Sequence, residues 1–380
     1  MTYQHEKSLK NLNFTIPLIV LILVVIGLLA IGSAVEINNP EMSGRSFLER
    51  QLVAFGLGII LIIMMQIFDY RQLKYNSIII YFFTLALLVY TLFTAGQISG
   101  ARRWLIIGPF SFQPSEFAKI FLIIVLAAFL ENQRDELQTL MGFIKSFIIV
   151  IIPTGLIIMQ NDLGTAMVML FIFMAMLYVA GANKKIMFVV FGGAFLVVVA
   201  FIFLHLTFDI PVPFLQQYQL NRLLVFINPE IDPQGSGYNI IQSLIAVGSG
   251  GLTGKGLFAG TQNQLNFLPE KHTDFIFSVI GEEFGFLGAT IIILLYIFLI
   301  WQLLKIALNC KNKFGKLLVS GYTAMLFFHV FENIGMTMGL MPITGIPLPF
   351  ISYGGSSLIS FLFGLGIVIN VNLYKRKLSF

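Results

Sequence analysis

A cluster of ionisable residues opens an apolar stretch in the second half of the chain, in KHTDFIFSVIGEEFG. Its aspartate, Asp274, could act as a general base, because a carboxylate partly withdrawn from water has a raised pKa and accepts a proton from a hydroxyl. The alternative is structural, since aspartate stabilises helix N-termini and the neighbouring Thr273 could serve there equally well. Lys271 and His272 directly precede Asp274 and are candidates for binding a substrate.

Two further carboxylates follow in the same stretch. On a helix that began at Asp274, Glu282 would lie about 80° around the axis and Glu283 nearly opposite. We therefore expect that Glu282 and Glu283 do not face the same site. At least one of them should pair with a polar group on another helix, because an unpaired charge in a membrane is costly.

A second pair of charges, Glu116 and Lys119, lies near the start of another apolar stretch. Their spacing of three permits a structural ion pair on one helix face. Alternatively, Lys119 contacts a phosphate and Glu116 orients it or a metal, since ionisable groups inside a membrane are candidates for function. His329 and Glu332 are also three apart, and could pair with each other or with Lys119. Asp162 is most simply the N-cap of the helix after it.

Cationic side chains gather in segments that lie between apolar stretches. The adjacent Arg102 and Arg103, followed by Trp104, are typical of an interfacial anchor in which long side chains reach water beside an aromatic ring. The other interpretation is an anion site, which Arg222 could join. The segment AVGSGGLTGKGLFAGTQ departs from a Walker A loop, because Ser249 replaces its first glycine and Gly256 follows its lysine. We expect these glycines to mark turns and closely packed backbone.

The composition indicates the environment in which these residues must act. Of the 380 residues, 57% are hydrophobic and only 11% are charged, whereas soluble domains carry about 25% charged residues. We predict an all-α polytopic membrane protein with one domain, residues 1–380. A spanning helix needs about 20 mostly apolar residues, and ten segments qualify. They are residues 14–35, 48–68, 75–95, 114–131, 141–160, 163–181, 185–206, 274–300, 317–340 and 349–373.

The distribution of basic residues predicts the orientation. Most of the 23 Lys and Arg residues lie in segments that are inside if the N-terminus is cytoplasmic, as the positive-inside rule requires. We therefore expect both termini in the cytoplasm and a large extracytoplasmic loop between the seventh and eighth helices, at about residues 207–273. The net charge of +5 thus reports orientation and does not indicate nucleic acid. The prolines of MPITGIPLPFISYGGSS predict non-helical backbone, which at membrane depth must be buried in protein or line a cavity.

Several stretches, taken together and in order, resemble the SEDS family (shape, elongation, division, sporulation). They cover most of the chain from about residue 98 onward: GARRWL…QPSEFAK, DLGTA, NPEIDPQGSGYNIIQS, GSGGLTGKG…GTQ…FLPEKHTDFIFSVIGEEFG and NIGMTMGLMPITGIPLPFISYGGSS. The set is specific, although no single stretch is. MPITGIPLPF is more similar to the elongation (RodA-like) branch than to the division branch. Asn161 stands where the family often has proline, which affects a turn.

The resemblance implies a peptidoglycan glycosyltransferase that polymerises lipid II, a disaccharide-pentapeptide on undecaprenyl diphosphate, into β-1,4-linked strands with inversion. The essential aspartate of the family's HTDF motif falls on Asp274, as the base that deprotonates the acceptor sugar. The cationic candidates for the leaving diphosphate are Arg102, Arg103, Lys119, Arg222 and Lys271. The further substrate-binding candidates are Trp104, Glu116 and His272.

The resemblance also implies a partner, a class B penicillin-binding protein that crosslinks the strands, and a location in the bacterial cell membrane, among its lipids, with the site facing outward. It allows a divalent cation, Mg or Mn, without a ligand set in the sequence, and it implies no organic cofactor. A lipid II flippase or a proton-coupled transporter is the alternative, in which Asp274, Glu116, His329 and Glu332 would relay protons. A scaffold that only positions the transpeptidase is a third possibility, and it would tolerate replacement of Asp274.

Overall fold

The computed structural model describes residues 14–35, 44–98, 101–107, 110–133, 135–208, 217–265 and 267–374. Ten long helices run through this part of the chain, and each corresponds to one predicted span, so the all-α fold class is confirmed. They are α1 (Thr15–Val35), α2 (Gly44–Ile67), α4 (Ser77–Thr94), α5 (Pro114–Leu130), α6 (Leu140–Met159), α7 (Leu163–Ala180), α8 (Lys184–Phe208), α12 (Ile276–Asn309), α13 (Lys313–Thr337) and α14 (Gly355–Leu373). In the described ranges, nine of these are long and apolar enough to cross a membrane, and α5, with 17 residues, is slightly shorter.

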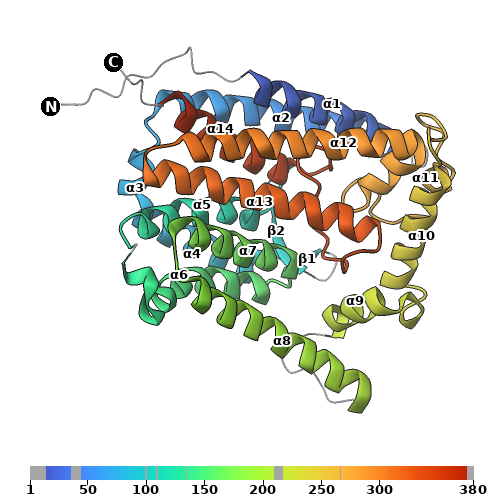
Figure 1. The fold of residues 1–380 in the computed structure, drawn as a ribbon. Coiled ribbons are helices and arrows are strands. Elements are labelled where there is room, and N and C mark those ends of the chain that lie inside the picture. Colours follow the sequence, from blue (N-terminus) through green and yellow to red (C-terminus); the bar gives the residue numbers. More distant parts are fainter. Residues whose placement is uncertain are drawn as a thin grey trace.

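Short elements connect the long helices. They are α3 (Gln72–Tyr75), the strands β1 (Gly96–Ile98), β2 (Ala101–Ile107) and β3 (Phe110–Phe112), the 3₁₀ turns η2 (Glu136–Gln138) and η3 (Pro229–Ile231), and α9 (Gln217–Ile227), α10 (Ser236–Ser249) and α11 (Thr261–Gln264). The strands form an antiparallel sheet in the order β1-β2-β3, which we did not predict. In Figure 1 the sheet and α9–α11 lie toward one end of the bundle and α3 lies at the other. This arrangement fits helices that cross a membrane in alternating directions, and the cytoplasmic location of both termini stays a prediction.

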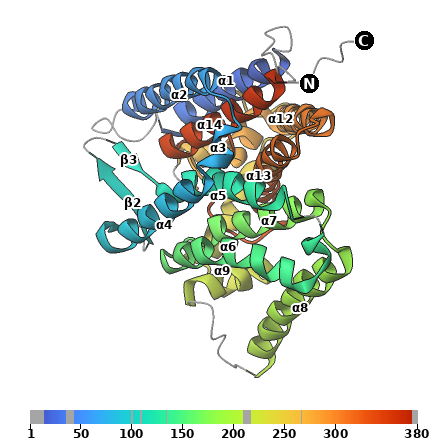
Figure 2. The ribbon, with the colours of Figure 1, turned by 90° about the vertical axis from the view of Figure 1, so that its left-hand side faces the viewer.

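The helices differ in how far they are surrounded by protein. Most of α13 and α14 is buried inside the bundle, whereas almost no residue of α8 is fully buried although the helix is strongly apolar. Figure 2 shows α8 at the edge, directed away from the other helices. A helix that is apolar all round and exposed requires an apolar surrounding, so α8 faces lipid in a membrane. The buried centre formed by α5, α13 and α14 is therefore where polar side chains can be held in fixed geometry.

The helix α12 is interrupted, and the glycine-rich segment 250–256 packs against the interruption. Gly285 has φ 65° and ψ −164°, which breaks the helical hydrogen bonding. Four backbone bonds replace those that are lost: Phe286 N–H to Gly251 O (2.9 Å), Leu287 N–H to Leu252 O (3.1 Å), Lys255 N–H to Glu282 O (3.0 Å) and Gly256 N–H to Glu283 O (3.0 Å). A Cβ on Gly254 would lie 2.1 Å from Glu283 O. The expectation that these glycines mark closely packed backbone is confirmed.

The segment between α13 and α14, residues 338–354, is non-helical and largely buried, as its prolines predicted. Gln51 of α2 holds its end, because the Gln51 amide donates to Ser352 O at 3.1 Å and accepts from Gly354 N–H at 3.1 Å. The segment also reaches the residues before α12, since Ser352 Oγ donates to Thr273 O at 2.7 Å. Two stretches of irregular backbone, 270–275 and 341–354, are thus fixed against each other.

Candidate active site

Asp274 lies in a turn that precedes α12 and does not belong to the helix. Its N–H donates to Glu270 O at 3.1 Å, and α12 begins at Ile276 with Phe275 as its N-cap and without a capping side chain. The capping alternative for Asp274 is therefore wrong. The residue is half-buried, so part of its surface stays open.

Gly345 forms one wall beside this carboxylate. The residue has φ +72°, and a Cβ built on it would lie 3.0 Å from Asp274 Oδ2 and 3.8 Å from Arg222 Nη1. Arg222, on α9, also donates from Nη1 to Thr344 O at 3.4 Å. A carboxylate and a guanidinium, far apart in sequence, therefore meet over a glycine of the 341–354 segment.

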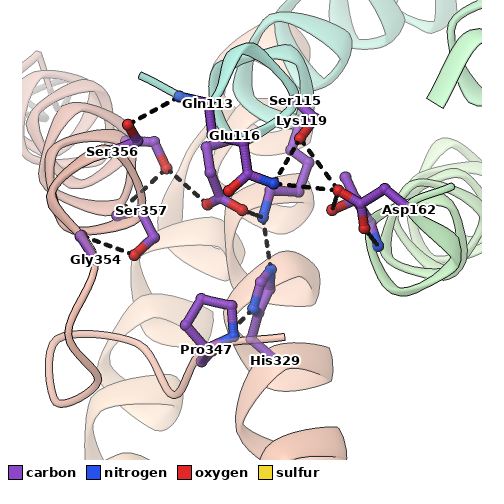
Figure 3. Close-up of polar contacts among 12 residues, drawn as sticks. Gln113, Ser115, Glu116, Lys119, Asp162, His329, Pro347, Gly354, Ser356 and Ser357 are labelled. Carbon is purple, nitrogen blue, oxygen red and sulfur yellow. Dashed lines mark hydrogen bonds and ion pairs between the residues drawn. The ribbon is translucent and has the colours of Figure 1, made fainter. Parts of the chain in front are cut away.

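A second arginine approaches from β2. Arg103 Nη1 lies 3.5 Å from Asp162 Oδ1, and the Arg103 side chain keeps a quarter of its surface exposed. The buried Asp162 is the predicted N-cap of α7, since its Oδ1 accepts from Thr165 N–H at 3.2 Å. Figure 3 shows Gln113 and Ser115 beside the same carboxylate, and Gln113 Nε2 donates to Asp162 Oδ2 at 3.2 Å. Asp162 is therefore saturated with donors and holds Arg103 at the site.

The charges around Asp274 act on its proton affinity. Burial raises the pKa of Asp274 to about 6, while the positive charge of Arg103, and more weakly that of Arg222, opposes the rise. The negative charge of Glu270 adds to it. A carboxyl group with such a pKa is ionised at neutral pH and is a stronger base than an ordinary aspartate. The arrangement can accept a proton beside two cations.

Lys271 and His272 have structural contacts that we did not predict. The Lys271 ammonium donates to Asn263 O at 2.5 Å, and burial lowers its pKa to about 8, opposed by the charge of Glu282. The His272 ring packs against Phe47 and Tyr353 at centroid distances of 5.4 and 5.7 Å. These contacts hold the turn that carries Asp274, so the structure gives both residues a positioning role, and their contact with a substrate stays a prediction.

Glu116 and Lys119 form an ion pair inside the bundle. Lys119 Nζ lies 2.9 Å from Glu116 Oε1 and 2.9 Å from His329 Nε2, as Figure 3 shows. Lys119 and His329 are fully buried, and Glu116 is 2% exposed. His329 Nδ1 lies 3.2 Å from Pro347 O, which requires the proton on Nδ1 and leaves Nε2 to accept from Lys119. The structure supports the structural pair and not the predicted contact of Lys119 with a phosphate.

The two remaining candidates lie on β2. Trp104 is half-buried and stands opposite Gly96 of β1. The backbone of Arg102 belongs to the same strand, and its side chain lies outside the described part of the chain. Of the predicted site residues, the structure thus gathers Arg103 and Arg222 around Asp274.

Glu282 and Glu283 both face the segment 254–263, Glu283 through Phe258 and Asn263, so the expectation that they do not face the same site is wrong. Glu282 Oε1 accepts from Lys255 Nζ at 2.7 Å and from Gln262 N–H at 2.9 Å. Glu283 Oε1 accepts from Ser33 Oγ of α1, which confirms the expected pairing with another helix. The prediction from helical geometry failed because residues 250–263 wrap around the break in α12 and so contact both glutamates.

Sequence reasoning named His329 and Glu332 on α13 but missed Asn333, which completes a polar face with them. His329, Glu332 and Asn333 are spaced by three and four residues, which places them on the same side of the helix. Each contacts the 341–354 segment: His329 at Pro347 O, Glu332 Oε1 as acceptor from Thr344 Oγ1 (2.8 Å), and Asn333 Nδ2 as donor to Ile346 O (2.8 Å). His329 and Glu332 therefore do not pair with each other, and the alternative pairing with Lys119 is confirmed for His329. The signal was three polar residues at helical spacing in an otherwise apolar span.

Comparison with known proteins places this geometry in a family. The family model for FtsW, RodA and SpoVE, described as "Cell cycle protein", matches residues 14–377. Among relatives, the peptidoglycan glycosyltransferase MrdB of Escherichia coli (strain K12) is 38% identical and covers 97% of this chain and 95% of its own. The stage V sporulation protein E of Bacillus subtilis (strain 168) is 39% identical, covering 96% and 98%.

Solved structures agree with the sequence comparison. A structure described as showing structural coordination of polymerization and crosslinking by a peptidoglycan synthase complex matches with a TM-score of 0.81 and 34% identity, over 96% of this chain and 98% of that one. The crystal structure of the rod shape determining protein RodA of Thermus thermophilus matches with a TM-score of 0.70 and 32% identity, over the same shares. The chain therefore belongs to the FtsW/RodA/SpoVE (SEDS) family, and its likeness to MrdB and RodA supports the RodA-like branch.

Proposed function

We propose that this protein is a peptidoglycan glycosyltransferase that polymerises lipid II into β-1,4-linked glycan strands during cell elongation. The observation that carries the proposal is the half-buried Asp274, whose raised pKa suits a general base and which has Arg103 and Arg222 beside it. Relatives that align over nearly the whole chain carry the same enzyme name.

The reaction follows from this arrangement. The 4-hydroxyl of the acceptor GlcNAc attacks the anomeric carbon of the donor MurNAc, and the Asp274 carboxylate takes the hydroxyl proton. The new C–O bond forms on the face opposite the leaving group, so the α-linked donor gives a β-linked product. The bond to undecaprenyl diphosphate breaks, and its electron pair leaves with the diphosphate. Arg103 and Arg222 stabilise the charge that develops there.

The described side chains alone form no closed ligand set for a divalent cation. Among the residues that the structure describes, no group of three or more His, Cys, Asp or Glu could hold a metal ion. The Asp162 carboxylate already accepts from Thr165, Gln113 and Arg103. In our proposal Arg103 and Arg222 supply the positive charge that stabilises the leaving diphosphate.

The location and the partner belong to the same proposal. The apolar helices make this a multi-pass membrane protein, and we place it in the bacterial cell membrane with Asp274 on the outer side, where lipid-linked sugars are used. The partner is a class B penicillin-binding protein that crosslinks the strands. The match to a structure described as a complex that coordinates polymerization and crosslinking supports this partner.

Polymerisation of lipid II by the purified protein with its transpeptidase partner tests the proposal. Wild type should produce glycan chains, and Asp274→Asn, at equal folded amount, should produce none. Asp69→Asn is the matched control, because Asp69 is a half-buried carboxylate paired with Arg71 near α3, and it should leave chain formation unchanged. Chains from Asp274→Asn would remove Asp274 as the base. Movement of lipid II across vesicles without polymer would favour a flippase.

A further inference from the structure

We propose that Asn333 is a positioning residue for the reaction, because its side-chain amide ties the main chain of Asp274 to the 341–354 segment. This inference rests on the proposed function. Asn333 lies on α13, and Nδ2 donates to Asp274 O at 2.9 Å and to Ile346 O at 2.8 Å. One amide group thus joins the residue that carries the base to the residue next to Gly345.

The bond acts where the local backbone is irregular. Asp274 lies in a turn and not in a helix, so its carbonyl needs a partner from elsewhere in the fold. Asn333 is fully buried, and a buried amide that satisfies two carbonyls has little freedom to move without leaving them unpaired. The amide therefore fixes the position of the Asp274 main chain relative to that of Ile346.

The position of the Asp274 main chain matters because Gly345 lies directly beside the Asp274 carboxylate. A Cβ on Gly345 would lie only 3.0 Å from Asp274 Oδ2, so the carboxylate already rests against the main chain of that glycine. A shift between the two backbones would move the carboxylate against Gly345 and Arg222. A displacement of about 1 Å can reduce a rate about 100-fold, which is the scale of effect expected of a positioning residue.

Glu332 and His329, on the same face of α13, contact the 341–354 segment but not Asp274. Glu332 contacts Thr344, and His329 contacts Pro347. Both residues fix the segment on either side of Gly345 and Ile346. Among the hydrogen bonds from this face of α13, in the described part of the chain, that of Asn333 reaches Asp274 itself.

A matched residue exists at another place in the fold. Asn370 of α14 is also fully buried, and its Nδ2 also donates to two main-chain carbonyls, Met65 O at 2.5 Å and Phe68 O at 2.9 Å. Both carbonyls belong to the end of α2 and its following turn, next to α3. Asn370 Oδ1 also accepts from Tyr70 N–H at 3.1 Å, so Asn370→Ala removes the same two donations and one further hydrogen bond without touching the site.

The experiment compares steady-state lipid II polymerisation by wild type, Asn333→Ala and Asn370→Ala, each with the transpeptidase partner and normalised to folded protein. We expect kcat to fall about 10- to 100-fold for Asn333→Ala with KM changed less than twofold, and both constants to stay near wild type for Asn370→Ala. Asn333→Leu, which keeps the branched shape of the side chain and removes the donors, should match Asn333→Ala and serves if the alanine variant does not fold.

The outcomes separate the inference from the function on which it rests. An Asn333→Ala or Asn333→Leu enzyme with wild-type kcat would overturn the positioning role while polymerisation by wild type stands. A fall in kcat equal to that of Asn370→Ala would do the same, because it would reflect general loosening of the bundle. Absence of chains from wild type, with lipid II and partner present, would overturn the proposed function and this inference with it.

Discussion

The ammonium of Lys119 on α5 lies 2.9 Å from Nε2 of His329 on α13, and both side chains are fully buried. Glu116 completes the group at 2.9 Å from the same ammonium. The group links two helices of the buried centre, and through His329 it reaches the carbonyl of Pro347 in the segment beside Asp274.

We expect Lys119→Met to destabilise the protein by about 3–5 kcal/mol, because removal of one partner leaves the Glu116 charge buried and uncompensated. Thermal unfolding in detergent measures this. The double variant Glu116→Gln/Lys119→Met should recover much of the loss, since no unpaired charge remains. A single variant as stable as wild type would contradict the structural role.

Gly345→Ala should remove most of the activity. The φ of +72° is unfavourable for alanine, and the new Cβ would lie 3.0 Å from Asp274 Oδ2. Gly339→Ala is the matched control, since Gly339 has φ +68° and its Cβ would meet only the Leu244 side chain at 3.5 Å. Each substitution places a Cβ in left-handed backbone, which costs about 1–2 kcal/mol, so this strain should lower the free energy of unfolding alike in both variants. A fall of at least about tenfold in kcat is expected of Gly345→Ala alone, and equal rates would contradict the close contact.

Sequence reasoning located the helices because apolar runs of membrane length leave little choice of structure. It also placed Asp162 as a cap, since a cap depends on a few neighbouring residues. It failed where distant backbone segments meet. The orientation of Glu282 and Glu283 depends on a glycine-rich segment that wraps around a break at Gly285, and no periodicity along α12 reveals that contact.

In the candidate site, too, some features were predictable from the sequence and others were not. Asp274, Arg103 and Arg222 were named as charged residues in polar segments, and the structure brings them together. Lys119 was named for the same reason and is buried, because charge type alone does not distinguish a structural pair from a ligand contact. Asn333 was not named at all, since an uncharged amide in an apolar span becomes informative only when its two carbonyl partners are known.

The rate of polymerisation should depend on pH with an acid limb near pH 6. Asp274 must be ionised to accept a proton, and burial raises its pKa to about 6. Activity should therefore rise about fivefold between pH 5 and pH 6, about tenfold between pH 5 and pH 7, and level off above that. Initial rates measured across this range in one ionic strength test this. A limb near pH 4 would mean that the carboxylate is not withdrawn from water.

The same raised pKa predicts that Asp274→Asn stabilises the protein at neutral pH. The folded state binds a proton at Asp274 up to about pH 6, whereas the unfolded chain releases it near pH 4. Between these values the folded state holds more protons, so wild-type stability falls as pH rises through this window. Asparagine does not ionise and avoids that loss. The melting temperature of Asp274→Asn should exceed that of wild type at pH 8, and the difference should vanish near pH 4. If Asp274→Asn is less stable than wild type at pH 8, the ionised carboxylate stabilises the fold. That result would contradict the prediction that burial of the ionised Asp274 destabilises the folded state.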